Sequence, residues 1–143
     1  MDRDRLRLFA GTALAVVVVV AFGLSRIGGV GGLGDGPVPT CQDPVAWDDT
    51  SLRAGQRTAV TGVVVQVGAA PEAGGAPSFL NLGNAHPDDE RFDIVIYEQV
   101  SERFDVRPGP AWEGREVCVQ GRVRDRDGVL QIILEDPAYL SVR

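Results

Sequence analysis

The sequence predicts a small all-β barrel that follows an N-terminal membrane-spanning or signal helix. Three observations support this prediction. An apolar run without charges lies near the N-terminus, short segments of alternating apolar and polar residues follow residue 41, and turns rich in Gly, Pro and Asp separate those segments. A chain of 143 residues has room for one folded domain beyond the helix.

Composition divides the chain into four parts. They are a basic stub at residues 1–7, a transmembrane anchor or signal peptide at 8–27, a Gly/Pro-rich linker at 28–40 and a folded domain at 41–143. The apolar run, Leu8 to Leu24, would span about 26 Å as a helix, close to the roughly 30 Å hydrocarbon core. The arginines before it place the N-terminus in the cytoplasm and the domain outside. The small-x-small triplet Ala21-Phe22-Gly23 leaves open a cleaved signal peptide and a secreted domain.

The domain contains both cysteines and is acidic. Residues 41–143 carry 10 Arg against 17 Asp and Glu, a formal charge of −7. Disulfides persist outside the cytoplasm, so we expect Cys41 and Cys118 to be paired; the alternative is two unpaired thiols. Closing so long a loop is worth roughly 4 kcal/mol of stability on a chain-entropy argument.

The sequence contains few candidate residues for catalysis or metal binding. His86 is the single histidine, and no Ser or Cys stands in a nucleophile-elbow pattern such as G-x-S-x-G. The acidic run Asp88-Asp89-Glu90 is interpreted as a solvated loop; a weak calcium loop is the alternative, but the spaced ligands of an EF-hand are missing. We therefore expect a protein without catalytic activity, resident metal or cofactor.

Six segments are predicted to be strands: Gln56–Val67, Ser78–Leu82, Phe92–Tyr97, Glu116–Arg124, Val129–Leu134 and Tyr139–Val142. The first is long and β-branched, and Gly62 marks a bulge or sharp coil at which it can bend across two sheets. In the third, Phe92, Ile94 and Ile96 share one face while Asp93, Val95 and Tyr97 share the other. Glu98 to Phe104 can form two helical turns before the prolines that follow.

The fourth and fifth predicted strands form a hairpin around the turn Asp125 to Gly128. In the strand before it, Val117, Val119, Gly121 and Val123 are predicted to face inward, so Cys118 points outward. Cys41 can then reach Cys118 only if the segment before the first strand crosses the outside of the barrel. A long bent first strand, five or six strands in all, and one short helix between the third and fourth strands together predict an OB-fold barrel.

Three stretches of this domain resemble a known family. They are Gly55 to Val64 (GQRTAVTGVV), Ser78 to Gly83 (SFLNLG) and Gly114 to Val123 (GREVCVQGRV), completed by the hairpin that ends in Gln131-Ile132-Ile133 and by Glu135-Asp136-Pro137. The domain resembles extracytoplasmic OB-fold proteins of the nucleic-acid-binding type, which are bacterial, membrane-anchored proteins described as DNA-binding. The resemblance covers about Cys41 to Val142. It implies a bacterial cell membrane crossed once, with the C-terminal domain extracytoplasmic.

The resemblance also implies a binding face on the second and third strands. In such barrels aromatic side chains stack bases while basic side chains follow the phosphates. Here the candidate ligand-binding residues are Phe79, Asn81, Tyr97, Arg57 and Arg91. The simpler alternative is that Phe79 and Tyr97 cap the barrel and the arginines are solvated.

Two functions remain open from the sequence. The first is binding of single-stranded nucleic acid or a nucleotide-like ligand. The second is a protein–protein or envelope-component interaction module, which the charge of −7 favours because it repels a polyanion. The expected partners are thus the membrane, through the N-terminal helix, and either single-stranded nucleic acid or an envelope protein. Arginines clustered on one face would favour the first function, and an uncharged or acidic groove the second.

Overall fold

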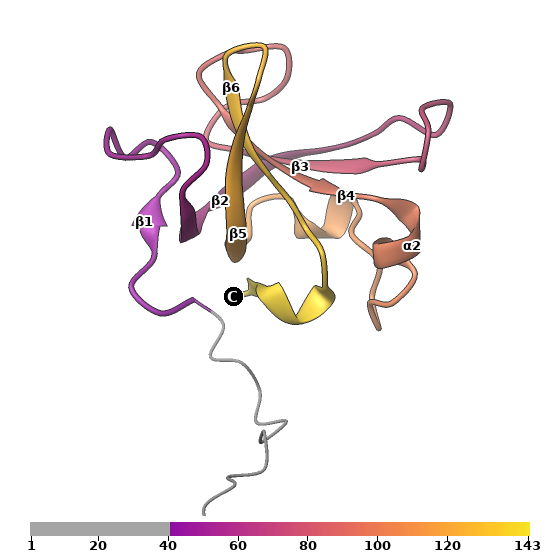
Figure 1. The fold of residues 1–143 in the computed structure, drawn as a ribbon. Helices are drawn as coiled ribbons and strands as arrows, with labels where there is room; N and C mark the ends of the chain where they lie inside the picture. Colours follow the sequence, from indigo (N-terminus) through magenta and orange to yellow (C-terminus); the bar gives the residue numbers. More distant parts are fainter. Residues whose placement is uncertain (1–40) are drawn as a thin grey trace, which may run out of the picture. The chain divides into compact units, whose positions relative to one another are not determined.

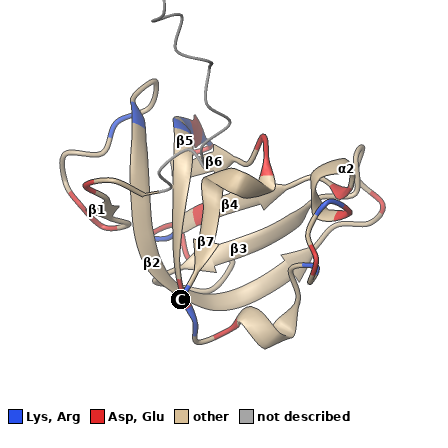
Figure 2. Ribbon diagram, turned by 90° about the horizontal axis from the view of Figure 1, so that it is seen from below, with Lys and Arg blue, Asp and Glu red and all other residues tan. Residues whose placement is uncertain are grey.

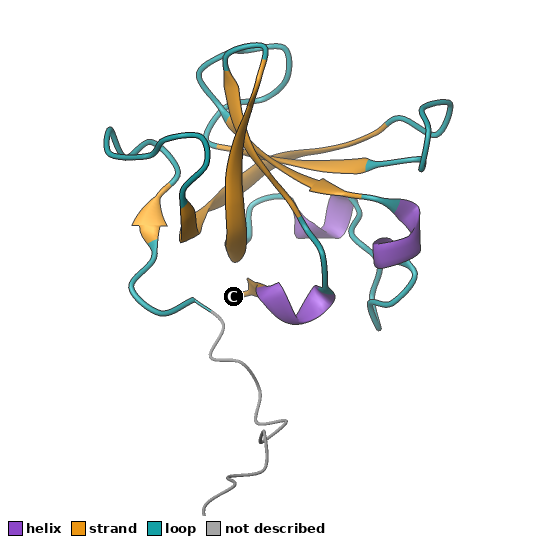
Figure 3. Cartoon of the chain, in the orientation of Figure 1, coloured by secondary structure: helices purple, strands orange, loops and turns teal. Residues whose placement is uncertain are grey.

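The computed structural model describes residues 41–143, which form a five-stranded barrel with two short additional strands (Figure 1). The strands are β1 (Val45–Ala46), β2 (Arg57–Ala69), β3 (Ser78–Leu82), β4 (Phe92–Ile96), β5 (Glu116–Arg126), β6 (Val129–Ile133) and β7 (Leu140–Val142). Within residues 41–143, helix is confined to one turn, α2 (Glu98–Ser101), and to the 3-10 segments η2 (Pro110–Trp112) and η3 (Pro137–Tyr139) (Figure 3). The predicted membrane segment at 8–27 and the linker at 28–40 lie outside the described residues. Within residues 41–143 no helix is long and apolar enough to cross a membrane.

Strand pairing closes the barrel in the order β2-β3-β4-β6-β5-β2. Every pairing in this ring is antiparallel except β4 with β6, which is parallel. The helix α2 follows β4 and precedes β5, where the sequence placed it. This connectivity is that of an OB-type barrel, so the predicted fold class is confirmed for the described part of the chain.

The first barrel strand bends where it changes partners. β2 pairs with β5 from Arg57 to Val63 and with β3 from Val64 to Ala69. The register shifts between Val64 and Gln66, so the bulge lies there and not at Gly62, as predicted. Gly62 has a different role: a Cβ at this position would lie 2.8 Å from Cδ1 of Trp47, so only glycine lets that indole approach the barrel.

Alternation along the strands fills the barrel interior. Fully buried side chains from all five strands meet there: Val60, Val64, Leu80, Leu82, Phe92, Ile94, Ile96, Val117, Val119, Val123 and Ile132. Gly121 shares the inward face of β5, and Cγ2 of Ile132 lies 2.7 Å from where its Cβ would be. Trp112 adds to this core and packs edge-to-face on Phe104, with ring centroids 5.6 Å apart.

Two elements differ from the sequence prediction. The helix after β4 has one turn, not two, and no side chain caps its first turn. Strand β1 was not predicted. It pairs in parallel with Val60 and Thr61 of β2, and its two residues are too few to show a periodic pattern.

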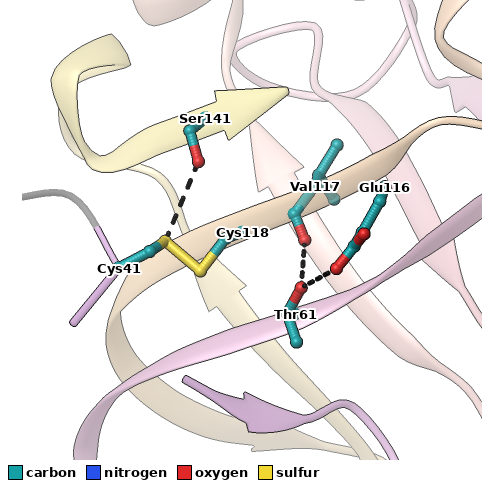
Figure 4. Close-up of a disulfide and its surroundings, with 6 residues drawn as sticks. All are labelled: Cys41, Thr61, Glu116, Val117, Cys118 and Ser141. Carbon is teal, nitrogen blue, oxygen red and sulfur yellow. Dashed lines mark hydrogen bonds between the residues drawn. A yellow bond between two sulfur atoms is a disulfide. The ribbon is translucent and has the colours of Figure 1, made fainter. Parts of the chain in front are cut away.

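A disulfide joins the start of the domain to the barrel wall (Figure 4). Cys41 and Cys118 are bonded, with Cα atoms 6.0 Å apart, which confirms the predicted pairing. Cys118 lies between the inward-facing Val117 and Val119, hence on the outside of β5, yet it is covered. Ser141 of β7 lies beside Cys41, its Oγ 4.0 Å from the sulfur. The disulfide is compatible with a location outside the cytoplasm.

Candidate functional site

A groove of about 630 Å³ lies on the outer face of the barrel. Its lining comes from five strands and three connections between them: Gln66, Gly68, Ala69, Ala70, Phe79, Asn81, His86, Pro87, Asp89, Arg91, Asp93, Arg126, Asp127, Val129 and Gln131. The loop at residues 83–91 and the turn of the β5–β6 hairpin both contribute to its lining. Its volume is that of a site for a ligand of small-molecule size.

Strand alternation places a row of polar side chains across this groove. Leu80 and Leu82 point into the core, so Phe79 and Asn81 point outward. The pairing register then sets Gln66 opposite Asn81, Asn81 opposite Asp93, and Asp93 opposite Gln131. We call Gln66, Asn81, Asp93 and Gln131 the polar row. Adjacent members stand on adjacent strands, about 4.8 Å apart.

A hydrogen-bonded ion pair fixes the centre of the polar row. Oδ1 of Asp93 accepts hydrogen bonds from Nδ2 of Asn81 at 2.7 Å and from Nε of Arg91 at 2.9 Å. The side chains of Arg91 and Asp93 are only 10% and 8% exposed. Arg91 also donates to the carbonyl oxygen of Asp88 in the bordering loop. The guanidinium charge is thus compensated within the protein.

These partners determine which way two of the amides face. An ionised carboxylate only accepts hydrogen bonds, so Asn81 must turn its nitrogen toward Asp93, which leaves its Oδ1 as an acceptor. Oε1 of Gln66 accepts from the backbone N–H of His86 at 2.9 Å, which leaves its Nε2 as a donor. Asn81 and Gln66 therefore present a fixed acceptor and a fixed donor to the groove.

The charges at the groove are mixed. Its lining contains Asp89, Asp93 and Asp127 against Arg91 and Arg126. Basic residues elsewhere in the domain are spread around the barrel among acidic ones (Figure 2). Arg103 and Arg107, for example, pair with Asp136 and Glu102. The described residues therefore show no continuous basic track of the kind that follows a phosphate backbone.

The structure brings together three of the five predicted ligand-binding residues. Phe79, Asn81 and Arg91 line the groove. Tyr97 does not, because β4 ends at Ile96 and the Tyr97 ring packs over Gly75, whose Cβ would lie 2.7 Å from its Cδ1. Arg57 also lies away from the groove, at the start of β2, with its Nη2 4.0 Å from Glu135. Whether the three grouped residues bind a ligand stays a prediction.

Several groove residues were not predicted as part of the site. Asp93 was expected on the face opposite Phe92, Ile94 and Ile96, and the alternation of β6 sends Gln131 outward. Strand parity gives these directions, but only the β4–β6 register brings the two side chains together. Gln66 could not be found this way, because the β2 bulge sets its direction.

The groove lining contains few groups suited to acid–base catalysis or metal binding. The side chains of Asp88, Asp89 and Glu90 are exposed, and no group of three or more His, Cys, Asp or Glu within residues 41–143 is placed to hold a metal ion. The carboxyls with shifted pKa lie outside the groove lining. Hydrogen bonds from the Ser51 side chain and backbone lower the pKa of Asp49, and the Ala138 backbone N–H, followed by Arg103, lowers that of Asp136.

Comparisons with solved structures give distant likenesses, among them a HINb domain and an OB domain. No protein-family model matches the chain, and no curated protein matches it. It is similar to the crystal structure of the p204 HINb domain, at 15% identity and a TM-score of 0.45, over 65% of this chain and 42% of that one. It is also similar to the solution NMR structure of the OB domain of MM0293 from Methanosarcina mazei, at 12% identity and a TM-score of 0.46, over 71% of this chain and 84% of that one.

Proposed function

We propose that residues 41–143 form a non-catalytic binding module, held outside a bacterial membrane by the N-terminal segment, with the groove as its ligand site. One observation carries this proposal. The outward-facing residues of β2, β3, β4 and β6 converge on one hollow that combines the aromatic ring of Phe79 with the polar row. A hollow in which polar groups converge beside an aromatic ring is a common candidate for a ligand site.

The charge distribution favours an envelope component over nucleic acid as the ligand. Binding of a nucleic acid draws most of its affinity from phosphates neutralised by Lys or Arg. The groove has a formal charge of −1 from Asp89, Asp93 and Asp127 against Arg91 and Arg126, and Asp93 already compensates Arg91. The domain around it carries −7. A polyanion would therefore enter a repulsive field with one uncompensated lining cation to meet it.

The test is a map of backbone amide NMR shifts on the ¹⁵N-labelled full chain, in a detergent without a sugar headgroup. The probes are a soluble enzymatic digest of the cell envelope and oligothymidylate, both at low salt. We expect the digest to shift signals of the groove residues and oligothymidylate to leave them in place. The Phe79→Ala variant should lose the effect and Arg57→Ala should keep it, since Arg57 lies outside the groove. The proposal would be contradicted if the digest left the amide shifts of the groove residues unchanged, or if oligothymidylate changed them.

A further inference from the structure

The polar row points to a particular chemistry of ligand. We propose that the groove binds an uncharged oligosaccharide, with a sugar ring on Phe79 and sugar hydroxyls hydrogen-bonded to Gln66, Asn81 and Gln131. This inference rests on the proposed function and narrows its ligand class.

Gln131 leaves hydrogen-bonding atoms open to the groove. It is only 7% exposed and lines the groove, yet its side-chain amide makes no hydrogen bond within residues 41–143. Neither its amide oxygen nor its amide nitrogen is a buried atom without a partner, so both are open to the groove, where a ligand hydroxyl can replace solvent at them. Asp93, its neighbour across the β4–β6 register, is already engaged by Asn81 and Arg91. The amide of Gln131 is therefore left for a ligand in the groove.

The donors and acceptors of the polar row match hydroxyl groups. Gln66 offers a donor through Nε2, Asn81 an acceptor through Oδ1, and Gln131 both. A hydroxyl group both donates and accepts, and it rotates to suit its neighbours, so a polyhydroxylated ligand can satisfy all three positions. Phe79 stands two residues from Asn81 on the same face of β3 and supplies an apolar surface for the C–H face of a sugar ring.

The lining charges argue against an anionic ligand on the same groups. Arg91 is compensated by Asp93, and Arg126 is flanked by Asp125 and Asp127. A phosphate would therefore meet one cation and nearby carboxylates, which repel it. The binding of a neutral sugar does not depend on these charges. OB-type barrels as a class include oligosaccharide binders, so the fold permits this ligand.

The experiment is calorimetric titration of the full chain, in a zwitterionic detergent, with chitotetraose, maltotetraose, mannotetraose and oligothymidylate. We expect one of the tetrasaccharides to bind with an affinity that stays within twofold between low and moderate salt, because no ions are released. Gln131→Ala should weaken that binding about tenfold through the loss of its hydrogen bonds. The matched control Gln99→Ala, on the exposed face of α2, should leave it unchanged. Circular dichroism of both variants checks that the barrel is intact.

Each other outcome overturns the inference in a distinguishable way. If the envelope digest shifts the groove signals but no tetrasaccharide binds, the inference fails and the proposed function stands. If a tetrasaccharide binds equally well to Gln131→Ala, the polar row is not its site and the inference fails. If oligothymidylate binds in the groove with steep salt dependence, the inference and the envelope-component proposal both fail.

Discussion

The ion pair between Arg91 and Asp93 lines the groove, and breaking it should lower the stability of the domain by a measurable amount. In Asp93→Ala, Arg91 loses the carboxylate that compensates it while its side chain is 10% exposed, and Asn81 loses its acceptor. Removing one partner of a buried ion pair leaves an uncompensated charge and costs about 3–5 kcal/mol. Rearrangement of Arg91 toward solvent would lower this cost, so we expect about 3 kcal/mol.

Urea unfolding followed by tryptophan fluorescence measures this difference. With a slope of about 2 kcal/mol/M, the Asp93→Ala midpoint should fall by about 1.5 M. The matched control is Glu102→Ala, which breaks a pair of exposed side chains with Arg107 at 3.4 Å and should cost about 0–1 kcal/mol. Replacing Arg91 and Asp93 together should recover part of the loss, because no unpaired charge remains. An Asp93→Ala midpoint within about 0.3 M of the wild type would refute this reasoning.

Three further perturbations test the fold and its electrostatics. Gly83 has φ +79°, and a Cβ there would lie 2.1 Å from Cζ2 of Trp47. Gly83→Ala should therefore lower the free energy of unfolding in urea by about 2–5 kcal/mol. A decrease of less than about 1 kcal/mol would contradict this packing. Replacing Cys41 and Cys118 by Ser should cost up to roughly 4 kcal/mol, and alkylation of the native protein without reductant should add no mass; added mass would contradict the disulfide. The pKa of Asp136 is lowered from 3.8, so its contribution to stability is present above that value and is lost as pH falls through the folded pKa. The stability difference between wild type and Asp136→Asn should therefore shrink on acidification, and a difference independent of pH would contradict the assignment.

Alternation and turn chemistry predicted most of the barrel. The hairpin turn is an instance: Asp127 and Gly128 have φ +55° and +90°, the two positive values that a two-residue type I′ turn requires and that Asp-Gly favours. Strand β3 has the predicted bounds, and the other predicted strands differ by one or two residues at their ends. The β2 bulge was misplaced because Gly62 serves a close approach of Trp47, and sequence alone does not separate these two uses of glycine.

The candidate site was predicted only where local parity decides it. Phe79 and Asn81 follow from the inward direction of Leu80 and Leu82. Tyr97 was expected beside them, but the strand ends one residue earlier and the chain turns into α2, which moves the ring away from the groove. Gln131 joins the site through the parallel pairing of β4 with β6, a long-range register that the sequence does not specify locally.

The side-chain amide NMR signals of the glutamines report directly whether a ligand occupies the groove. The full chain, with ¹⁵N-labelled glutamine side chains, is titrated with the soluble envelope digest. If the groove is the ligand site, the signals of Gln66 and Gln131 shift and saturate together, while that of the exposed Gln99 stays in place. Saturation of the protein with the Gln131 signal unmoved would show that the ligand binds elsewhere and would contradict the account.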